Sequence, residues 1–381
     1  MIYLDNAATS WPKPPQVIQA ILDVLKRGCA NPGRSAHAMA RQAEDALLSV
    51  REVIANFFNI NDPMRIAFMP NTTYALNTAI YGVITRGSTV VTTAMEHNSV
   101  LRPLKTLEKE GTINLEIIKP DKYGKVSIQN IKKTLRKGIE LFCMTLSSNV
   151  TGAIMPVAEA GKICRAHGIT FLVDAAQGAG VIPIDVEKMN IDLLAFPGHK
   201  GLFGPQGTAG LYVREGVIIK PLVQGGTGSF SDRLVQPEIF PDVLESGTLN
   251  VPGIVGLGKG ILFINDTGIE NIQFQKKSLL EMLFDGLGRE SNINIYSPPP
   301  EQNSGILALS VQDMDSSEVS YLLDRKFGIC TRSGFHCAPL SHLALGTTDT
   351  GLVRISPGYF NNETEIELAI KAIQSIARGM Y

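Results

Sequence analysis

Two side chains in the middle of the chain, Asp174 and Lys200, have the types and positions that suit one chemistry. Asp174 follows the apolar run Thr170–Val173, and this run predicts a buried strand. Lys200 follows a second apolar run, Leu193–Phe196, in a loop that also holds glycines. A lysine can form a Schiff base with the aldehyde of pyridoxal phosphate (PLP), and an aspartate can keep its pyridine nitrogen protonated. The pair therefore predicts a PLP site at the ends of neighbouring strands.

Each of these side chains also has an ordinary interpretation. A lysine in a glycine-rich loop is usually solvated, and a buried aspartate could pair with an arginine elsewhere. Their combination with the neighbouring His199 and with a phosphate site favours the cofactor. Desolvation beside a cationic ring would lower the pKa of Lys200 from about 10.4, as imine chemistry needs. Gln177 follows Asp174 closely and could hydrogen-bond the phenolic oxygen of the ring.

Two further segments follow candidate strands and could complete this site. Pro70–Thr73 opens a predicted helix, Tyr74–Tyr81, and free N–H groups with hydroxyls at a helix N-terminus form an anion site. Simple capping of the helix is the alternative. His97 follows the run Thr89–Thr93, so its ring could lie over the pyridine ring and help move protons. An ordinary loop histidine is the alternative there.

A second chemical signal lies near the C-terminus, in the segment Arg332–Cys337. Free cysteines are usually buried and inert. Cys337 is instead flanked by polar and turn residues, with cations nearby in sequence that favour the thiolate. Arg354 lies on a predicted short strand, and its planar guanidinium suits an amino-acid carboxylate, although a surface arginine is the alternative. A metal at His336 and Cys337 is disfavoured, because only His342 lies near them in sequence.

The segments between these residues predict the framework that positions them. Short apolar runs alternate with helical patterns, which indicates an α/β fold with a mostly parallel sheet covered on both faces. Such sheets bind ligands at the carboxyl ends of their strands, where the polar residues above fall. The candidate strands are Arg65–Met69, Thr89–Thr93, Leu115–Ile118, Glu140–Leu146, Thr170–Val173, Leu193–Phe196 and Gly210–Val213.

The chain is long enough for two domains, and its character changes near residue 270. Before that point, Gln224–Asn250 is rich in Gly, Ser, Thr and Pro and predicts a long loop. After it, the pattern predicts a smaller α+β unit. We expect a large domain over residues 16–262 and a small domain built from residues 1–15 and 263–381.

The composition is that of an ordinary soluble protein, with 44% hydrophobic and 19% charged residues. The net charge of -1 gives no electrostatic case for binding nucleic acid or an anionic membrane. No apolar run is long enough to span a membrane, and the first residues do not resemble a secretory signal. The five cysteines are widely scattered, which argues against a disulfide framework and leads us to expect a cytoplasmic protein.

These residues together resemble the fold-type-I PLP enzymes of the class V aminotransferase family. Within it, the chain is similar to the group II cysteine desulfurases and selenocysteine lyases. The resemblance runs along the whole chain. The segments that carry it are Tyr3–Thr9, Asn71–Thr73, Glu96–His97, Ser148–Asn149, Val173–Gln177, Gly198–Lys200, Glu245–Thr248, Arg332–Cys337 and Arg354.

The resemblance implies a role for each matching residue. Lys200 forms the Schiff base and shuttles the Cα proton, Asp174 pairs with the pyridine nitrogen, and Cys337 attacks the substrate sulfur. The other cofactor contacts that it implies are Gln177, His97, Thr72, Thr73, His199 and, from the second subunit of a homodimer, Thr248. The implied substrate-binding residues are Asn149, Arg354 and Arg332.

The expected reaction converts L-cysteine to L-alanine and leaves a persulfide on Cys337 for a protein sulfur acceptor, as in iron-sulfur cluster assembly. The alternatives are a selenocysteine lyase acting on L-selenocysteine, a class V aminotransferase acting on another amino acid, and a non-catalytic scaffold. Two positions depart from the family pattern. Pro197 stands where relatives often have a phosphate-binding serine, and Phe335 stands where group II members often have a histidine.

Overall fold

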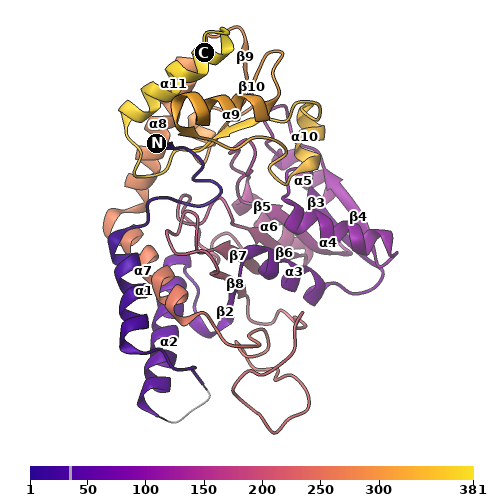
Figure 1. Cartoon of the computed structure of the whole chain (residues 1–381). Coiled ribbons are helices and arrows are strands. Elements are labelled where there is room, and N and C mark those ends of the chain that lie inside the picture. Colours follow the sequence, from indigo (N-terminus) through magenta and orange to yellow (C-terminus); the bar gives the residue numbers. More distant parts are fainter. Residues whose placement is uncertain (34–36) are drawn as a thin grey trace.

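The centre of the molecule is a seven-stranded sheet, in a computed structural model that describes residues 1–33 and 37–381 (Figure 1). The strand order is β2-β8-β7-β6-β5-β3-β4. Seven strands and a mostly parallel arrangement were the sequence prediction, and both are confirmed. The strands are β2 Ile66–Met69, β3 Ser88–Thr93, β4 Ile113–Ile118, β5 Ile139–Thr145, β6 Thr170–Asp174, β7 Leu193–Pro197 and β8 Ala209–Val213.

The register of the sheet aligns the strand ends that carry the candidate residues. Strands β3 to β7 pair in parallel, whereas β8 runs antiparallel to both β7 and β2. Asp174 at the end of β6 pairs with Thr145 of β5 on one side and with Ala195 of β7 on the other. The carboxyl ends of these three strands therefore form one continuous edge.

Helices cover both faces of this sheet, because neighbouring strand residues point to opposite sides. Phe171 packs in one buried cluster with residues of α2, α6 and α7, and its neighbour Leu172 packs in a second cluster with residues of α3 and α4. Each fully buried side chain of this size contributes about 1.5–3 kcal/mol. The helices are α1 Pro15–Arg27, α2 Ala38–Phe58, α3 Thr72–Val83, α4 Asn98–Lys109, α5 Ile128–Thr134, α6 Val157–His167 and α7 Val251–Thr267.

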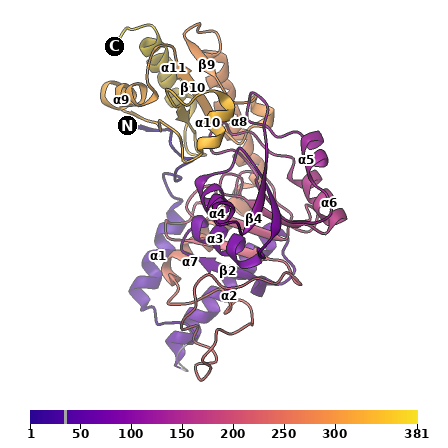
Figure 2. The same ribbon diagram turned by 90° about the vertical axis from the view of Figure 1, so that its right-hand side faces the viewer.

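A smaller lobe joins the two ends of the chain, as Figures 1 and 2 show. Its antiparallel sheet has the order β12-β10-β9, and the N-terminal strand β1 pairs in parallel with β11. A separate apolar cluster that includes Leu4, Leu309 and Ile373 holds these pieces together. The elements are β1 Ile2–Tyr3, α8 Ile269–Leu287, β9 Ile293–Ile295, β10 Leu307–Val311, α9 Ser316–Phe327, β11 Ile329–Cys330, α10 Pro339–Leu345, β12 Val353–Ile355 and α11 Glu363–Ala377.

Most predicted elements form within a few residues of their expected bounds. The first predicted strand is shorter than expected, because Pro63–Arg65 forms a 3-10 turn before β2 begins. The predicted loop Gln224–Asn250 holds neither helix nor strand. The bounds of the two domains stay a prediction. Among the described residues, no helix is long and apolar enough to cross a membrane.

Candidate active site

A cavity of about 130 Å³ lies at the carboxyl edge of the large sheet. Residues from several strand ends and from the start of α3 surround it, and most of the sequence-predicted cofactor residues are among them. The lining consists of Asn71, Thr72, Thr73, Leu76, His97, Ser99, Thr145, Ser147, Asn149, Asp174, Ala176, Gln177, His199 and Lys200.

Lys200 reaches this cavity from a tightly packed loop after β7. Burial, followed by the charge of Arg354, lowers the pKa of Lys200 to about 8. Desolvation is the cause of a lowered pKa that the sequence predicts, and burial is the largest cause here. The flanking glycines are required by close contact. A Cβ on Gly198 would lie 2.1 Å from the hydroxyl of Thr208, and one on Gly201 would lie 2.3 Å from the carbonyl of Ala179.

Asp174 is 3% exposed, and its Oδ1 accepts a hydrogen bond of 2.8 Å from the backbone N–H of Ala176. Burial raises its pKa despite this bond and the charge of Lys200. A protonated ring nitrogen would supply the counter-charge that this buried carboxylate calls for.

A second buried acid, Glu96, lies near Asp174. The sequence pattern includes this residue in the segment Glu96–His97 but predicts no role for it. Its Oε1 accepts hydrogen bonds from the Thr93 hydroxyl at 2.7 Å and from the backbone N–H of Thr145 at 3.1 Å. Burial raises the pKa of Glu96 to about 8, so the side chain is largely protonated at neutral pH. Glu96 therefore adds a neutral acid, and not a second charge, beside Asp174.

The start of α3 combines capping with a possible anion site. The Asn71 side chain caps the helix by accepting a hydrogen bond of 2.9 Å from the backbone N–H of Tyr74. The Thr72 and Thr73 side chains are not needed for that cap, and both residues line the cavity. Thr73 also shares a hydrogen bond of 2.7 Å with the hydroxyl of Ser99.

Ser99 also holds the ring of His97. The Nδ1 of His97 lies 2.8 Å from the Ser99 Oγ and accepts a hydrogen bond from the Ser99 backbone N–H. Burial and the nearby cations, first of them Lys200, lower the pKa of His97 to about 4. The imidazole is therefore neutral, and its proton lies on Nε2 because Nδ1 is an acceptor.

His199 and Thr248 were both expected at the phosphate. Burial lowers the pKa of His199 to about 4, and its buried Nδ1 has no hydrogen-bond partner within the described part of the chain. Such an atom is available to an oxygen-rich group. Thr248 is exposed and does not line the Lys200 cavity of its own chain. It lines a neighbouring cavity of about 230 Å³ with Tyr74.

Arg354 of β12 approaches from the small lobe and is 1% exposed, which rules out the surface alternative. Its Nη2 donates to Asp5 Oδ1 at 2.8 Å, and its Nη1 donates to the backbone carbonyl of Asn149 at 3.0 Å. Its buried Nε has no partner among residues 1–33 and 37–381. The contact with Asp5 could not be read from the sequence, because the two residues are almost the whole chain apart.

The loop that carries Cys337 is held by two hydrogen bonds from segments that follow strands of the large sheet. Asn149 Nδ2 donates to the carbonyl of His336 at 2.6 Å, and the first N–H of α4, from Asn98, donates to the carbonyl of Cys337 at 2.7 Å. His336 and Cys337 both have positive φ angles, of 48° and 58°. These bonds hold two uncommon backbone conformations that leave Cys337 exposed.

The expected cations around this thiol need one correction. His336 is buried, and desolvation lowers its pKa to about 2, so the ring is neutral. Arg332 supplies the nearby positive charge, with Nη2 at 3.8 Å from Sγ of Cys337. Arg332 thus lies at the thiol. Phe335, at the variant position, is 44% exposed and lies 4.9 Å from the ring of His342, which is buried on α10.

Comparison with known proteins identifies the family of this chain. The family model described as Aminotransferase class-V matches residues 2–368. The chain belongs to the class-V aminotransferase family. Among curated relatives, it is 36% identical to a "Probable cysteine desulfurase" of Methanothermobacter thermautotrophicus, over 99% of this chain and 94% of that protein. It is 34% identical to a protein of the same name from Pyrococcus abyssi, over 100% of this chain and 95% of that one.

Solved structures of this family have the same fold. The apo structure of a cysteine desulfurase from Thermococcus onnurineus NA1 has a TM-score of 0.93 at 32% identity, covering 99% of this chain and 95% of that chain. A cysteine desulfurase from Escherichia coli has a TM-score of 0.88 at 26% identity, covering 99% and 94% of the two chains. The α/β fold is thus that of the fold-type-I PLP enzymes, as expected.

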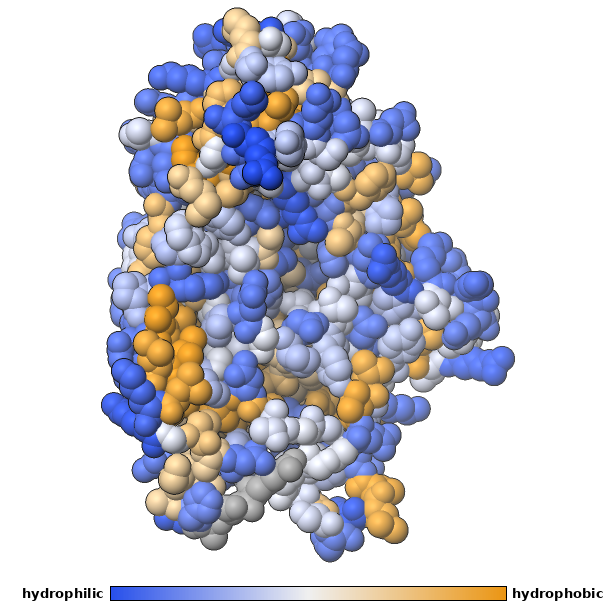
Figure 3. Space-filling view, viewed as in Figure 1, coloured by the Kyte–Doolittle hydropathy of each residue, from blue (hydrophilic) through white to orange (hydrophobic). Residues whose placement is uncertain are grey.

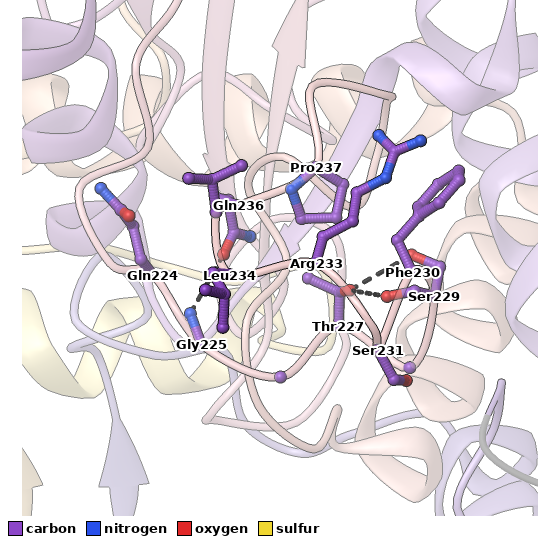
Figure 4. A pocket seen from close by; sticks show the side chains of 13 residues that line it. Gln224, Gly225, Thr227, Ser229, Phe230, Ser231, Arg233, Leu234, Gln236 and Pro237 are labelled. Atoms are coloured by element: carbon purple, nitrogen blue, oxygen red, sulfur yellow. Dashed lines mark hydrogen bonds between the residues drawn. The ribbon is translucent and has the colours of Figure 1, made fainter.

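Class-V aminotransferases depend on PLP, and the residues of the cavity fit it. The buried Asp174 calls for a cationic partner, Lys200 has a pKa near neutrality, and His199 has a free buried nitrogen. A larger cavity, of about 750 Å³, does not offer this chemistry (Figure 4). The loop 224–237 lines it, and Arg233 is the one charged residue of this lining within the part of the chain that the structure describes.

The sequence disfavours a metal at His336 and Cys337, and this stays a prediction. Within the described residues, no three or more His, Cys, Asp or Glu side chains are grouped so that they could hold a metal ion. His336 and His342 have ring centroids 5.8 Å apart.

Proposed function

We propose that the protein is a PLP-dependent cysteine desulfurase, which converts L-cysteine to L-alanine and leaves the sulfur as a persulfide on Cys337. One observation carries the proposal. The exposed thiol of Cys337 belongs to a loop that is hydrogen-bonded by Asn149, and Asn149 also lines the Lys200 cavity. The names of the relatives and of the solved structures support the same activity.

When bound, PLP supplies an aldehyde that condenses with amines and a ring that withdraws electrons from the substrate Cα. Asp174 would hold the ring nitrogen, Gln177 the ring oxygen and His97 the face of the ring. Thr72, Thr73 and His199 would hold the phosphate. The neutral imidazole of His199 keeps one N–H that can donate to a phosphate oxygen, and the neutral ring of His97 adds no positive charge next to the cationic pyridine ring.

Lys200 moves the protons of the reaction. With a pKa of about 8, its Nζ is partly unprotonated near neutral pH and can take the proton from the substrate Cα. Arg354 and Asn149 orient the substrate by its carboxylate, and the free Nε of the buried Arg354 remains available as a donor. A substrate held in this way presents its side chain to the exposed Cys337.

Cys337 performs the sulfur transfer. Its thiolate attacks the substrate sulfur, so that an S–S bond forms while the Cβ–S bond breaks and its electron pair passes to Cβ. Protonation of Cβ and return of a proton to Cα by Lys200 complete alanine, and the enzyme keeps the sulfur as a persulfide. The guanidinium of Arg332, 3.8 Å from Sγ, stabilises negative charge on the sulfur throughout.

The direct test measures alanine and sulfide formed from L-cysteine by the PLP-loaded protein in the presence of a reductant. Wild-type protein should form both, and Cys337→Ser should lose at least about a hundredfold in rate while it keeps the visible absorbance of bound PLP. Cys330→Ser is the matched control. Unchanged turnover by the Cys337 variant would contradict the persulfide step. Faster turnover of L-selenocysteine than of L-cysteine would favour the selenocysteine lyase alternative.

We further propose that the active form is a homodimer that acts in the cytoplasm and delivers sulfur to a protein acceptor. Thr248 would then reach the phosphate of the partner subunit. Exposed apolar side chains support an assembly. Figure 3 shows them gathered on the side where α1 lies, and the exposed apolar residues of this helix are Ile18, Leu22 and Leu25.

The oligomeric state is tested by light scattering after gel filtration. The mass of the wild-type protein should be twice the 41.2 kDa of one chain. Leu22→Asp should lower that mass toward one chain, because a charge in an apolar interface is costly. If the dimer carries Thr248 into the partner's site, the same variant also loses PLP. A wild-type monomer would refute the proposal.

A further inference from the structure

The backbone carbonyl of His199, directly before Lys200, accepts more hydrogen bonds than a carbonyl normally does. The donors are the Thr9 hydroxyl at 3.0 Å, the Ser10 N–H at 3.1 Å and hydroxyl at 3.3 Å, and Lys13 Nζ at 2.8 Å. All of them come from the N-terminal segment. A carbonyl has two lone pairs, so this convergence marks a peptide that is held with unusual strength.

The same segment also holds the next peptide. The Ser10 hydroxyl lies 2.8 Å from the carbonyl of Lys200, and Lys13 Nζ donates to that hydroxyl at 2.8 Å. Lys13 therefore contacts the peptide before Lys200 directly and the peptide after it through Ser10. Lys13 and His199 are 186 residues apart in the chain, so these contacts exist only in the folded protein.

The position of Lys13 is costly for the folded state. Burial lowers its pKa to about 8, and its hydrogen bonds go to neutral oxygens of Ser10 and His199. Among the described residues, no salt bridge to a carboxylate compensates the charge. Its charge also contributes to the low pKa of His199. A half-buried cation without a carboxylate partner is better explained by a task at the site than by stability.

We propose that Lys13 is a positioning residue, which fixes the His199–Lys200 peptide so that both side chains face the cofactor. The proposal rests on the function proposed above, since it assumes that Lys200 binds PLP. Lys13 acts through the backbone of these residues and through Ser10. It serves neither as acid nor as base. Its charged N–H donors hold the His199 carbonyl and the Ser10 hydroxyl in place.

The experiment compares PLP binding by ligand-free wild-type protein, Lys13→Met, Lys13→Arg and Ser10→Ala, followed by visible absorbance. Lys13→Met should raise the dissociation constant about tenfold to a hundredfold, as expected for the loss of a charged hydrogen bond. Lys13→Arg keeps a charged donor and should recover most of the affinity. Lys26→Met, at an exposed lysine of α1, is the matched control and should bind PLP like wild type.

A readout without cofactor separates positioning from a general effect on the fold. In ligand-free protein, Lys13→Met should speed the hydrogen exchange of residues 199–203, where the Phe203 N–H bonds to the Lys200 carbonyl, and leave the small lobe unchanged. If Lys13→Met does not fold, Ser10→Ala gives the same test through the weaker contact.

The outcomes distinguish the two proposals. If wild-type protein fails to bind PLP through Lys200, the proposed function is wrong. If wild type binds PLP and Lys13→Met binds it equally well, with unchanged exchange at 199–203, only the role of Lys13 is wrong. Weakened binding that Lys13→Arg does not improve would also overturn that role, because it would show that the charge is not what matters.

Discussion

The two halves of the site are built in different ways. Asp174 ends β6 and Lys200 follows the adjacent strand β7, so strand register brings both to the same edge, where the N-terminal segment also holds the Lys200 loop. Cys337 and Arg354 come from the small lobe. Hydrogen bonds from Asn98 and Asn149 hold the Cys337 loop, and Asp5 accepts from Arg354, so distant parts of the chain position this half. We infer that the first half is robust and the second half adjustable, because a strand register tolerates less change than a few hydrogen bonds.

The largest effect should come from the first half. Lys200→Ala removes the amine proposed to bind the cofactor and to move the Cα proton, so the visible absorbance should vanish and turnover should fall at least about a thousandfold. Absorbance and product assays check this. Cys337→Ser should lose turnover but keep the absorbance of bound PLP. Equal spectra for the two variants would contradict the distinction between the two halves of the site.

The second half is tested by Asp5→Asn. The variant leaves the guanidinium of Arg354, buried on β12, without its carboxylate partner at 2.8 Å. Because Asp5 is partly exposed, we expect a loss of about 1–3 kcal/mol in the free energy of unfolding. Chemical denaturation with and without PLP measures it. The visible spectrum should stay unchanged, and a lost spectrum would mean that the two halves are coupled.

The pH dependence of PLP uptake sharpens the account of Lys200. Only the neutral amine attacks an aldehyde, so the rate of absorbance growth should rise with pH and level off above a midpoint of about 8. The burial of Lys200 and the charge of Arg354 cause this low midpoint. Stopped-flow mixing of ligand-free protein with PLP between pH 6 and 10 measures it. A midpoint near 10.4, the value of a solvated lysine, would contradict a buried amine.

The smallest effect is expected at Glu96. Its pKa is raised in the folded state, so the stability that it contributes is fully present below its unfolded pKa and is lost as pH rises toward about 8. Glu96→Gln should remove this loss, by at most a few kcal/mol, and leave stability near pH 5 unchanged. Denaturation of both proteins at pH 5 and pH 8 checks it. If wild type and Glu96→Gln lose the same amount of stability between pH 5 and pH 8, other groups cause the pH dependence.

The sequence could predict the large sheet because each of its strands is a short apolar run between helical patterns. It was less informative about α4, α5 and α10, for which it gave no bounds. Proline lies inside α4, and the other two helices have only seven residues each. The site was predicted where chemistry follows a strand, as at Asp174. Asp5, Glu96 and Lys13 were not assigned roles, because their contacts are set by packing.

The order of the residue types along the chain determined the fold class, the PLP chemistry and the choice of Lys200 as the lysine proposed to bind the cofactor, since these depend on local patterns. Only the tertiary structure decided the charge state of His336, the pairing of Arg354 with Asp5 and the hold of Lys13 on the peptide of His199. The physical reason is that burial and long-range hydrogen bonds set protonation and position, and neither is encoded by any short segment of the chain.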